Sequence, residues 1–387
     1  MATVGDVVAA MQRRYPSALA ESWDAVGLTC GDPTAEVRRV LFAVDPAPVV
    51  VAEAIDSNVD LLVTHHPLLL RGVHSVARSS PKGRVVHDLI RAGVALFSAH
   101  TNADSAVPGV SDALADALGV VELKPLVPTT EELDKVVTFV PHAAAQAVLT
   151  ALAEAGAGRI GNYDRCGYLL EGTGTFRPLA GANPTIGEVG VVEEVAETRL
   201  EMVLSRDRRS AVVSALRAAH PYEEPAFDLF ELAAFDSRQG LGRVGSLPEP
   251  ETLEDLVGRV AAALPATVAG IQAGGDPDRV VQRIAVCAGA GDSMLGSAAR
   301  AQADAFVTAD LRHHPASEAM EAGGASLVNV SHWASEWPWL RVAADLLIED
   351  LGSAAAALDV HVSETCTDPW TMHAESLSRD LLEEDDA

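Results

Sequence analysis

Two internal repeats, one nested inside the other, constrain the fold of this chain more than any other feature. The outer repeat has an offset of 244 residues, because the segment DLLVT at 60–64 recurs as DAFVT at 304–308. Another apolar segment precedes each copy, LFAV at 41–44 and IAVC at 284–287, and an Ala-rich stretch follows it. A strand–helix–strand pattern that occurs twice predicts an α/β protein whose core has two similar lobes.

The inner repeat has an offset of 64 residues and lies between the two lobes. The apolar stretch 137–140 matches 201–204, and the helical stretch at 147–152 matches that at 211–216. Two βαβ halves of this size predict a ferredoxin-like domain over about 130–235. The alternative is a chance match between two Ala-rich helices.

The repeats divide the chain into a first lobe of the α/β core, an inserted ferredoxin-like (βαβ-βαβ) domain, a second lobe and an acidic tail. These segments are expected at 1–128, 129–236, 237–370 and 371–387. The Gly- and Pro-rich segment 240–256 is interpreted as a turn that returns the chain to the core, with Thr252 as the N-cap of a new helix. The N-terminal stretch predicts an amphipathic helix and lacks the apolar core of a signal peptide.

Charge and cysteine usage restrict the kinds of partner. The chain has 55 acidic and 28 basic residues, which gives a formal net charge of -27. Such a surface repels phosphate backbones and anionic lipids, so we expect no direct nucleic-acid binding and no membrane binding. The four cysteines lie far apart without a CxxC pair, and no apolar run is long enough to cross a bilayer. We therefore expect a cytoplasmic protein with reduced thiols.

Two adjacent histidines end the first copy of the repeated strand. His65 and His66 follow DLLVT directly, and Pro67 prevents a helix from continuing through them. Ligands collect at the C-terminal ends of strands in open α/β sheets, so this pair can address two neighbouring metal ions. The alternative is a pair of solvated or hydrogen-bonded histidines in a turn.

Further polar residues follow two other strand-like segments. Asp104 lies shortly after LFSAH, while His332 and Glu336 follow SLVNV. The spacing i, i+4 places His332 and Glu336 on one face of a helix, where an imidazole and a carboxylate can hold one ion. Taken singly, each motif also fits an ordinary turn or a pair on a helix surface.

Together these motifs supply three imidazoles and two carboxylates at predicted sheet edges. The five residues are His65, His66, Asp104, His332 and Glu336. Five nitrogen and oxygen ligands exceed the needs of one tetrahedral zinc and suit two divalent ions about 3.5–4 Å apart. Because no cysteine lies near them in the sequence, the expected metals are Zn, Fe or Mn.

Three more residues are candidates for a catalytic or ligand-orienting role. His100 precedes Asp104, whereas Asp310 and His314 follow the second copy of the repeated strand, at the position that corresponds to the first histidine pair. We expect them to face the same cavity. The segment HPYEE at 220–224 ends the second helix of the insert, and we assign it a structural role without chemistry.

The motifs together resemble the GTP cyclohydrolase 1 type 2 homologue family, also called the NIF-three-like family. They are ESWDAVGLTCGD, DLLVTHHPLL, SAHTNAD, HPYEEPAFDLFEL, GLGRVGSL, DAFVTADLRHHPA and NVSHWASE, and they cover nearly the whole chain except its C-terminal tail. The resemblance implies a two-lobed α/β core with a dinuclear metal centre, often a ferredoxin-like insert, and assembly as a toroidal homohexamer. It also implies the same five metal ligands. One departure is Ala25, where the family usually has Asn.

The leading functional hypothesis is a metal-dependent hydrolase with two divalent metal ions per chain. Its small-molecule substrate would be a nucleotide, a pterin-like molecule or a phosphoester, and two cations would let an otherwise acidic protein accept an anion. The ligand set does not by itself favour GTP, which the family name implies. The alternative is a non-catalytic metal carrier or a scaffold that handles a metallocofactor.

Overall fold

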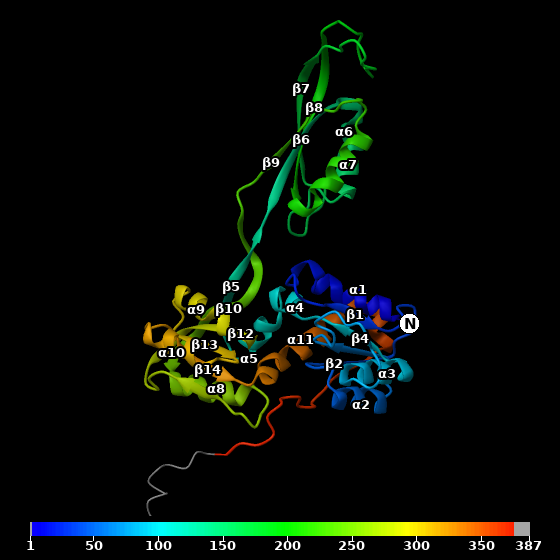
Figure 1. Ribbon diagram of the computed structural model, residues 1–387. Coiled ribbons are helices and arrows are strands. Elements are labelled where there is room, and N and C mark those ends of the chain that lie inside the picture. Colours follow the sequence, from blue (N-terminus) through cyan, green and yellow to red (C-terminus); the bar gives the residue numbers. More distant parts are fainter. Residues whose placement is uncertain (1, 375–387) are drawn as a thin grey trace, which may run out of the picture. The chain divides into compact units, whose positions relative to one another are not determined.

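The computed structural model describes residues 2–374 of the chain, which divide into two compact units. Unit 1 comprises the chain up to Thr129 and again from Arg238 onward, and unit 2 is Thr130–Ser237. The mixture of helices with several sheets confirms the predicted α/β fold (Figure 1). The predicted acidic tail, 371–387, lies for the most part outside the described residues. No described helix combines the length and the hydropathy that crossing a membrane requires.

The first lobe of unit 1 contains a five-stranded sheet. In spatial order its strands are β1 (Gly27–Cys30), β4 (Ala95–Ser98), β3 (Leu61–Thr64), β2 (Arg39–Ala43) and β15 (Asp359–Val362). Neighbouring strands are parallel except β1, which is antiparallel to β4. All residues of β3 and β4 are buried, as expected for parallel strands covered on both faces.

Within the described residues, five α-helices belong to the first part of unit 1. They are α1 (Val4–Arg14), α2 (Pro48–Asp56), α3 (Pro81–Ala92), α4 (Thr101–Ser105) and α5 (Val110–Ala117). The amphipathic helix expected at the N-terminus is α1, and a capping box between Thr3 and Asp6 fixes its first turn. The short helix α4 begins three residues after the end of β4, so it lies close to the C-terminal edge of the sheet.

The second lobe of unit 1 contains a six-stranded sheet. In spatial order its strands are β11 (Gln272–Gly274), β14 (Ser326–Val330), β13 (Ala305–Ala309), β12 (Val280–Ala290), β10 (Phe235–Thr252) and β5 (Val121–Glu131). Strands β12, β13 and β14 are parallel. The offset of 244 residues therefore relates two adjacent parallel pairs, β2 with β3 and β12 with β13.

Four α-helices of the described chain accompany the second sheet. They are α8 (Leu253–Ala263), α9 (Leu295–Arg300), α10 (His313–Glu321) and α11 (His332–Leu351). As predicted, Thr252 is the N-cap of α8, and it forms a capping box with Asp255. The helix expected from the spacing of His332 and Glu336 is α11, and both residues lie in its first turns.

The Gly-rich segment that we interpreted as a turn is part of the long strand β10. Its glycines allow close approach of the neighbouring backbone, because a Cβ atom on Gly240 would lie 2.2 Å from the Val127 carbonyl oxygen of β5. A Cβ atom on Gly245 would similarly lie 2.3 Å from the carbonyl oxygen of Val121. The turn prediction was wrong because crowding between two strands and a change of direction both select glycine.

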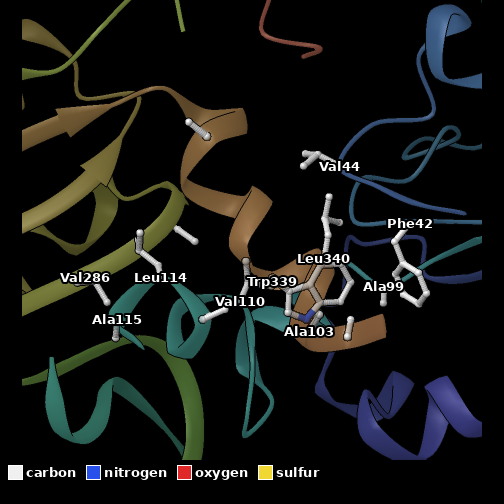
Figure 2. Packing of buried hydrophobic residues seen from close by; sticks show 14 of the residues in the cluster. Phe42, Val44, Ala99, Ala103, Val110, Leu114, Ala115, Val286, Trp339 and Leu340 are labelled. Atoms are coloured by element: carbon white, nitrogen blue, oxygen red, sulfur yellow. The ribbon is translucent and has the colours of Figure 1, made fainter. Parts of the chain in front are cut away.

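Helix α11 packs against strands of both sheets in unit 1. Trp339 and Leu340 of this helix are fully buried, with Phe42 of β2 and Val286 of β12 in the same cluster (Figure 2). The indole N–H of Trp339 donates a hydrogen bond of 3.1 Å to the Tyr15 hydroxyl, which satisfies the polar atom in this apolar environment. The packing fixes the N-terminal turns of α11 near the C-terminal ends of strands from both lobes.

Unit 2 has the element order β6-α6-β7-β8-α7-β9, which is that of a ferredoxin-like arrangement. Its sheet has the order β7-β8-β6-β9 with antiparallel neighbours. The elements are β6 (Leu133–Pro141), α6 (Ala145–Glu154), β7 (Gly167–Phe176), β8 (Glu193–Ser205), α7 (Arg209–Ala219) and β9 (Phe227–Glu231). The matched residues Val148 and Val212, and likewise Leu152 and Leu216, are fully buried in one cluster, so the offset of 64 residues reflects the core positions of two equivalent helices.

Candidate metal centre

The predicted site residues of unit 1 follow strands at their C-terminal ends. His65 and His66 come directly after β3, and His100 comes two residues after β4. His332 comes two residues after β14 and begins α11, which brings Glu336 to the same place one turn later. Residues that are far apart in the chain therefore meet where strands of the two sheets end.

Two groups of possible metal ligands form here and share one residue. One ligand atom each from His65, His66 and His100 lie within 4.8 Å of one another, and so do ligand atoms from His66, His332 and Glu336. His66 therefore belongs to both groups. No cysteine takes part in either of these groups, so the donors are imidazole nitrogens and carboxylate oxygens.

The carboxylate of Glu336 lies among three imidazoles. Its Oε1 atom is 2.9 Å from His332 Nε2 and 3.5 Å from His65 Nε2, while its Oε2 atom is 3.2 Å from His66 Nε2. Asp104 approaches from α4, with Oδ1 at 3.7 Å from His65 Nε2. This arrangement joins all five predicted ligands in one cluster.

Three buried side-chain atoms of this cluster have no hydrogen-bond partner within residues 2–374. They are His65 Nε2, Asp104 Oδ1 and Glu336 Oε2. His66 Nε2 is close to Glu336 Oε2 but does not form a hydrogen bond with it. Leaving a buried polar atom unpaired costs about 1–3 kcal/mol, so three such atoms in one cluster favour a partner that can contact both nitrogen and oxygen. A divalent cation satisfies both the nitrogen and the oxygen atoms, and the donor set fits one.

The opposite ring nitrogen of each histidine has an acceptor. His65 Nδ1 lies 2.9 Å from the Ala99 carbonyl oxygen, and His66 Nδ1 lies 2.8 Å from Asp45 Oδ1. His100 Nδ1 is 2.8 Å from an oxygen of Asp24, and His332 Nδ1 is 2.7 Å from one of Asp310. A proton on Nδ1 satisfies each of these acceptors and leaves the lone pair of Nε2 free to bind a metal ion or to accept a proton.

The ionisable side chains of the cluster change one another's pKa. Burial alone would raise the pKa of Glu336, but the histidines around it, His66 and His65 foremost, hold this pKa well below its ordinary value. Burial alone would lower the pKa of His66, yet the Glu336 carboxylate raises it well above the ordinary value. Burial raises the pKa of Asp104 to about 6. The cluster thus needs positive charge beside its carboxylates, which protons or metal ions can supply.

The cluster opens into a cavity of about 460 Å³, and His66, His332 and Asp310 form part of its wall. Three aspartates line it, and none of the described lining residues is Lys or Arg. The indole of Trp370, whose residue is 66% exposed, lies on the same wall. Only bound cations would make this cavity attractive to an anion.

The structure places the three other candidates differently. His100 joins one donor group, and Asp310 contacts His332, so both lie at the site. His314 does not: it is exposed in the first turn of α10, where its ring lies 5.1 Å from that of His313. The prediction for His314 assumed that the chain after β13 continues like the chain after β3. Instead α10 begins at His313, and both histidines of its first turn are exposed.

Two aspartates that sequence reasoning did not single out belong to the site. Asp45 follows β2 by two residues, and Asp24 lies in the loop before β1. The side chain of Asp24 accepts hydrogen bonds from the backbone N–H groups of Ala25 and Thr101 as well as from His100. The position of Asp45 after a neighbouring parallel strand was the available signal for that residue.

Comparisons with known proteins agree with the geometry. The family model described as Duf34/NIF3 (NGG1p interacting factor 3) matches residues 2–369. A Mycobacterium tuberculosis protein named GTP cyclohydrolase 1 type 2 homolog is 52% identical over 376 residues, which cover 96% of this chain and 98% of the relative. A Bacillus subtilis protein of the same name is 37% identical over 366 residues, with 94% and 97% covered.

Solved structures show the same fold. The crystal structure of a Bacillus cereus protein related to NIF3 matches with a TM-score of 0.79 and 34% identity, covering 96% of this chain and 99% of the other. A Staphylococcus aureus protein of known structure also gives a TM-score of 0.79, with 28% identity and the same coverage. The resemblance inferred from the motifs is confirmed, and the chain belongs to the Duf34/NIF3 (NGG1p interacting factor 3) family.

Proposed function

We propose that this protein is a metal-dependent hydrolase that holds two divalent ions between its two lobes. The ligands would be His65, His66, Asp104, His332 and Glu336. One observation carries the proposal: among the described residues, three atoms of this set are buried without a hydrogen-bond partner, and Asp104 Oδ1 and Glu336 Oε1 lie 3.7 and 3.5 Å from His65 Nε2. His66 belongs to both donor groups and Glu336 lies among three imidazoles, so the ligand set is better matched to two neighbouring ions than to one.

When bound, two divalent ions supply Lewis acidity that activates water and stabilises developing negative charge. The protein supplies the orientation. Asp45 holds the ring of His66 through Nδ1, and Asp310 holds that of His332 in the same way. Asp24 anchors His100 through Nδ1, which leaves His100 Nε2 as an acceptor for a proton released during hydrolysis.

The cavity supports a substrate with a planar polar ring. The indole of Trp370 offers a stacking surface on its wall, and the amides of Gln272 and Asn329 offer donors and acceptors beside it. These features suit a nucleotide or pterin-like ring more than a simple phosphoester. The relatives' name, GTP cyclohydrolase 1 type 2 homolog, is consistent with this class.

Metal analysis and substrate turnover together test the proposal. The purified protein, loaded in turn with Zn²⁺, Mn²⁺ or Fe²⁺, is assayed against GTP, other nucleotides, reduced and oxidised pterins, and phosphoesters. We expect about two ions per chain and turnover of a ring-containing substrate, both lost in His65→Ala. The matched control is His87→Ala, an exposed histidine on α3 outside both donor groups.

The outcomes separate the two functions that the sequence suggests. Metal binding without turnover of any compound in the panel would favour the carrier or scaffold. A single ion held with unchanged affinity by His65→Ala would contradict the site itself. The expected homohexamer is part of the same proposal, and sedimentation velocity of the metal-loaded protein tests it.

A further inference from the structure

Unit 2 contains a cavity of about 450 Å³ that the proposed hydrolase does not use. Residues of β6, β7 and β8 line it together with the segments 182–186 and 222–226. Its walls are largely apolar and are formed by Phe139, Phe176, Pro178, Pro184, Ile186 and Tyr222. A concave site of a few hundred Å³ with apolar walls and a few polar groups is typical of small-molecule binding.

One buried carboxylate faces this cavity. Glu197 of β8 is only 7% exposed, and its Oε1 atom accepts a hydrogen bond of 2.8 Å from the Tyr222 hydroxyl. No described residue donates a hydrogen bond to its Oε2 atom. The neighbouring strand makes room for this oxygen, because a Cβ atom on Gly174 would lie 2.0 Å from it. This oxygen is not among the buried atoms that lack a partner, so it is accessible from the cavity, where a charged or strongly polar group can bind it.

The HPYEE segment holds this arrangement in place. His220 is buried, with Nε2 at 3.0 Å from the Phe139 carbonyl oxygen, and its Nδ1 accepts from the backbone N–H of Tyr222. The Thr185 hydroxyl donates to the Pro221 carbonyl, and this bond ties the loop wall to the same segment. Burial, together with Glu197, raises the pKa of Tyr222, so its phenol remains a hydrogen-bond donor. The segment that had no assigned chemistry therefore positions a polar pair inside an apolar cavity.

The charges around the cavity favour a cation. Glu197 is its one buried charged lining residue among those described, whereas Glu223, Glu224 and Arg177 are exposed. Among the described lining residues, carboxylates thus outnumber the one guanidinium, that of Arg177, while the Arg199 guanidinium lies outside this lining, 5.8 Å from the centroid of the Phe139 ring. The rings of Phe176 and Tyr222 meet edge to face at 5.7 Å, and aromatic faces attract cations as well as apolar groups.

We propose that this cavity binds an organic cation, an ammonium group on an apolar or aromatic body, with Glu197 as its counter-ion. The ammonium would donate to Glu197 Oε2, and the body would pack against Phe139, Phe176 and Ile186. This site is independent of the metal centre, since all its residues belong to unit 2.

Calorimetric titration of the full chain with three compounds of similar shape tests the proposal. Tryptamine carries an ammonium, tryptophol a hydroxyl and indole-3-acetate a carboxylate on the same ring. At about 0.15 M salt, where exposed charges are screened, we expect tryptamine to bind about ten-fold or more tightly than tryptophol, and indole-3-acetate to bind weakest. Equal binding of the three compounds, or no saturable binding of tryptamine, would overturn the proposal.

Variants locate the binding. Glu197→Gln keeps the shape and removes the charge, so tryptamine affinity should fall about ten-fold while tryptophol affinity hardly changes. Glu194→Gln is the matched control, an exposed residue on the same strand. Tryptamine affinity that survives Glu197→Gln would contradict the site. Should that variant fold poorly by circular dichroism, Tyr222→Phe takes its place. This change removes the hydroxyl that holds Glu197 Oε1, so the carboxylate is no longer fixed in the cavity and tryptamine binding should weaken. His65→Ala should leave tryptamine binding unchanged. A failure of the proposed metal centre can therefore be distinguished from a failure of the proposed cation site.

Discussion

The two cavities of this protein have nearly the same volume, about 460 Å³ in unit 1 and 450 Å³ in unit 2, yet their chemistry differs. In unit 1, histidines and carboxylates from both lobes converge, and three of their buried atoms have no hydrogen-bond partner in the described part of the chain. In the cavity of unit 2, Glu197 is the one buried carboxylate among the described lining residues, and it lies among aromatic and aliphatic walls. The number and direction of the donors, rather than the space, decide what each cavity can bind.

The difference also concerns what each cavity requires of the fold. A metal ion demands several ligands at short, fixed distances, so unit 1 anchors each imidazole through its second nitrogen. An ammonium group demands one counter-ion and a surface to cover its apolar body. Substitutions in one unit should therefore leave binding in the other unchanged, and the following four predictions test that separation.

The largest effect is expected from Glu336→Gln. This change keeps the size of the side chain but removes the charge that lies among three imidazoles, so metal affinity should fall by about 100-fold or more. Competition with a chelator of known affinity measures the change. Glu349→Gln on the same helix is the control, because Glu349 is exposed. Unaltered metal affinity in Glu336→Gln would remove this residue from the ligand set.

A smaller loss is expected when an anchor rather than a ligand is changed. In Asp45→Asn the acceptor for His66 Nδ1 becomes a neutral amide, and metal affinity should fall about 10- to 100-fold. The same competition assay with a chelator measures this change in metal affinity. Since Asp45 lies outside unit 2, tryptamine binding should not respond. Weaker tryptamine binding with unchanged metal affinity would contradict the proposal that the two sites are independent.

Gly174→Ala should act on unit 2 alone. The added Cβ would lie 2.0 Å from Glu197 Oε2 and push the carboxylate from its position, at a cost of about 1–3 kcal/mol of unfolding free energy. Gly172→Ala on the same strand is the matched control, because no atom lies within 4 Å of its added Cβ. Denaturant unfolding followed by circular dichroism measures both. Equal stability of the two variants would mean that Gly174 does not make room for Glu197.

The smallest and most gradual effect is a pH dependence of unit 2. The pKa of buried Asp134 is lowered from 3.8, mainly by its hydrogen bond with Arg209. Asp134 therefore stabilises the folded state above pH 3.8, and this stabilisation is lost as the pH falls through and below that value. The difference in unfolding free energy between the wild type and Asp134→Asn should shrink on acidification from pH 7 to about pH 3. A difference that grows on acidification would mean that ionised Asp134 does not stabilise the folded state.

The fold, and the position of the proposed metal ligands after strand ends, could be predicted because both leave periodic or positional patterns in the sequence. Buried parallel strands form continuous apolar runs, and polar residues directly after them must lie at one edge of the sheet. Asp45 escaped notice because a lone aspartate after a strand is also an ordinary turn former. His314 was misplaced because an equivalent strand end does not guarantee the same continuation: β13 leads into α10, where the side chain is exposed.

No periodic or positional pattern in the sequence indicates the cavity in unit 2. Gly174, Glu197 and Tyr222 lie on different segments, and only the register of β7 with β8 and the path of the chain after α7 bring them together. Strand register depends on tertiary packing and not on local pattern. The same limit explains the error at β10, where glycines that admit a neighbouring strand were interpreted as a turn.

The order of the proposed metal ligands along the chain has a consequence for biosynthesis. His65, His66 and Asp104 belong to the first part of unit 1, whereas His332 and Glu336 lie on α11, and all of unit 2 is made in between. At about 5–20 residues per second, roughly 15–50 s separate the first ligand from the last during translation. Until α11 leaves the ribosome, the nascent chain carries only part of the donor set. If the proposed centre binds metal, its stable loading is therefore a late event, and we expect a chain that terminates before His332 to fail to retain the ions.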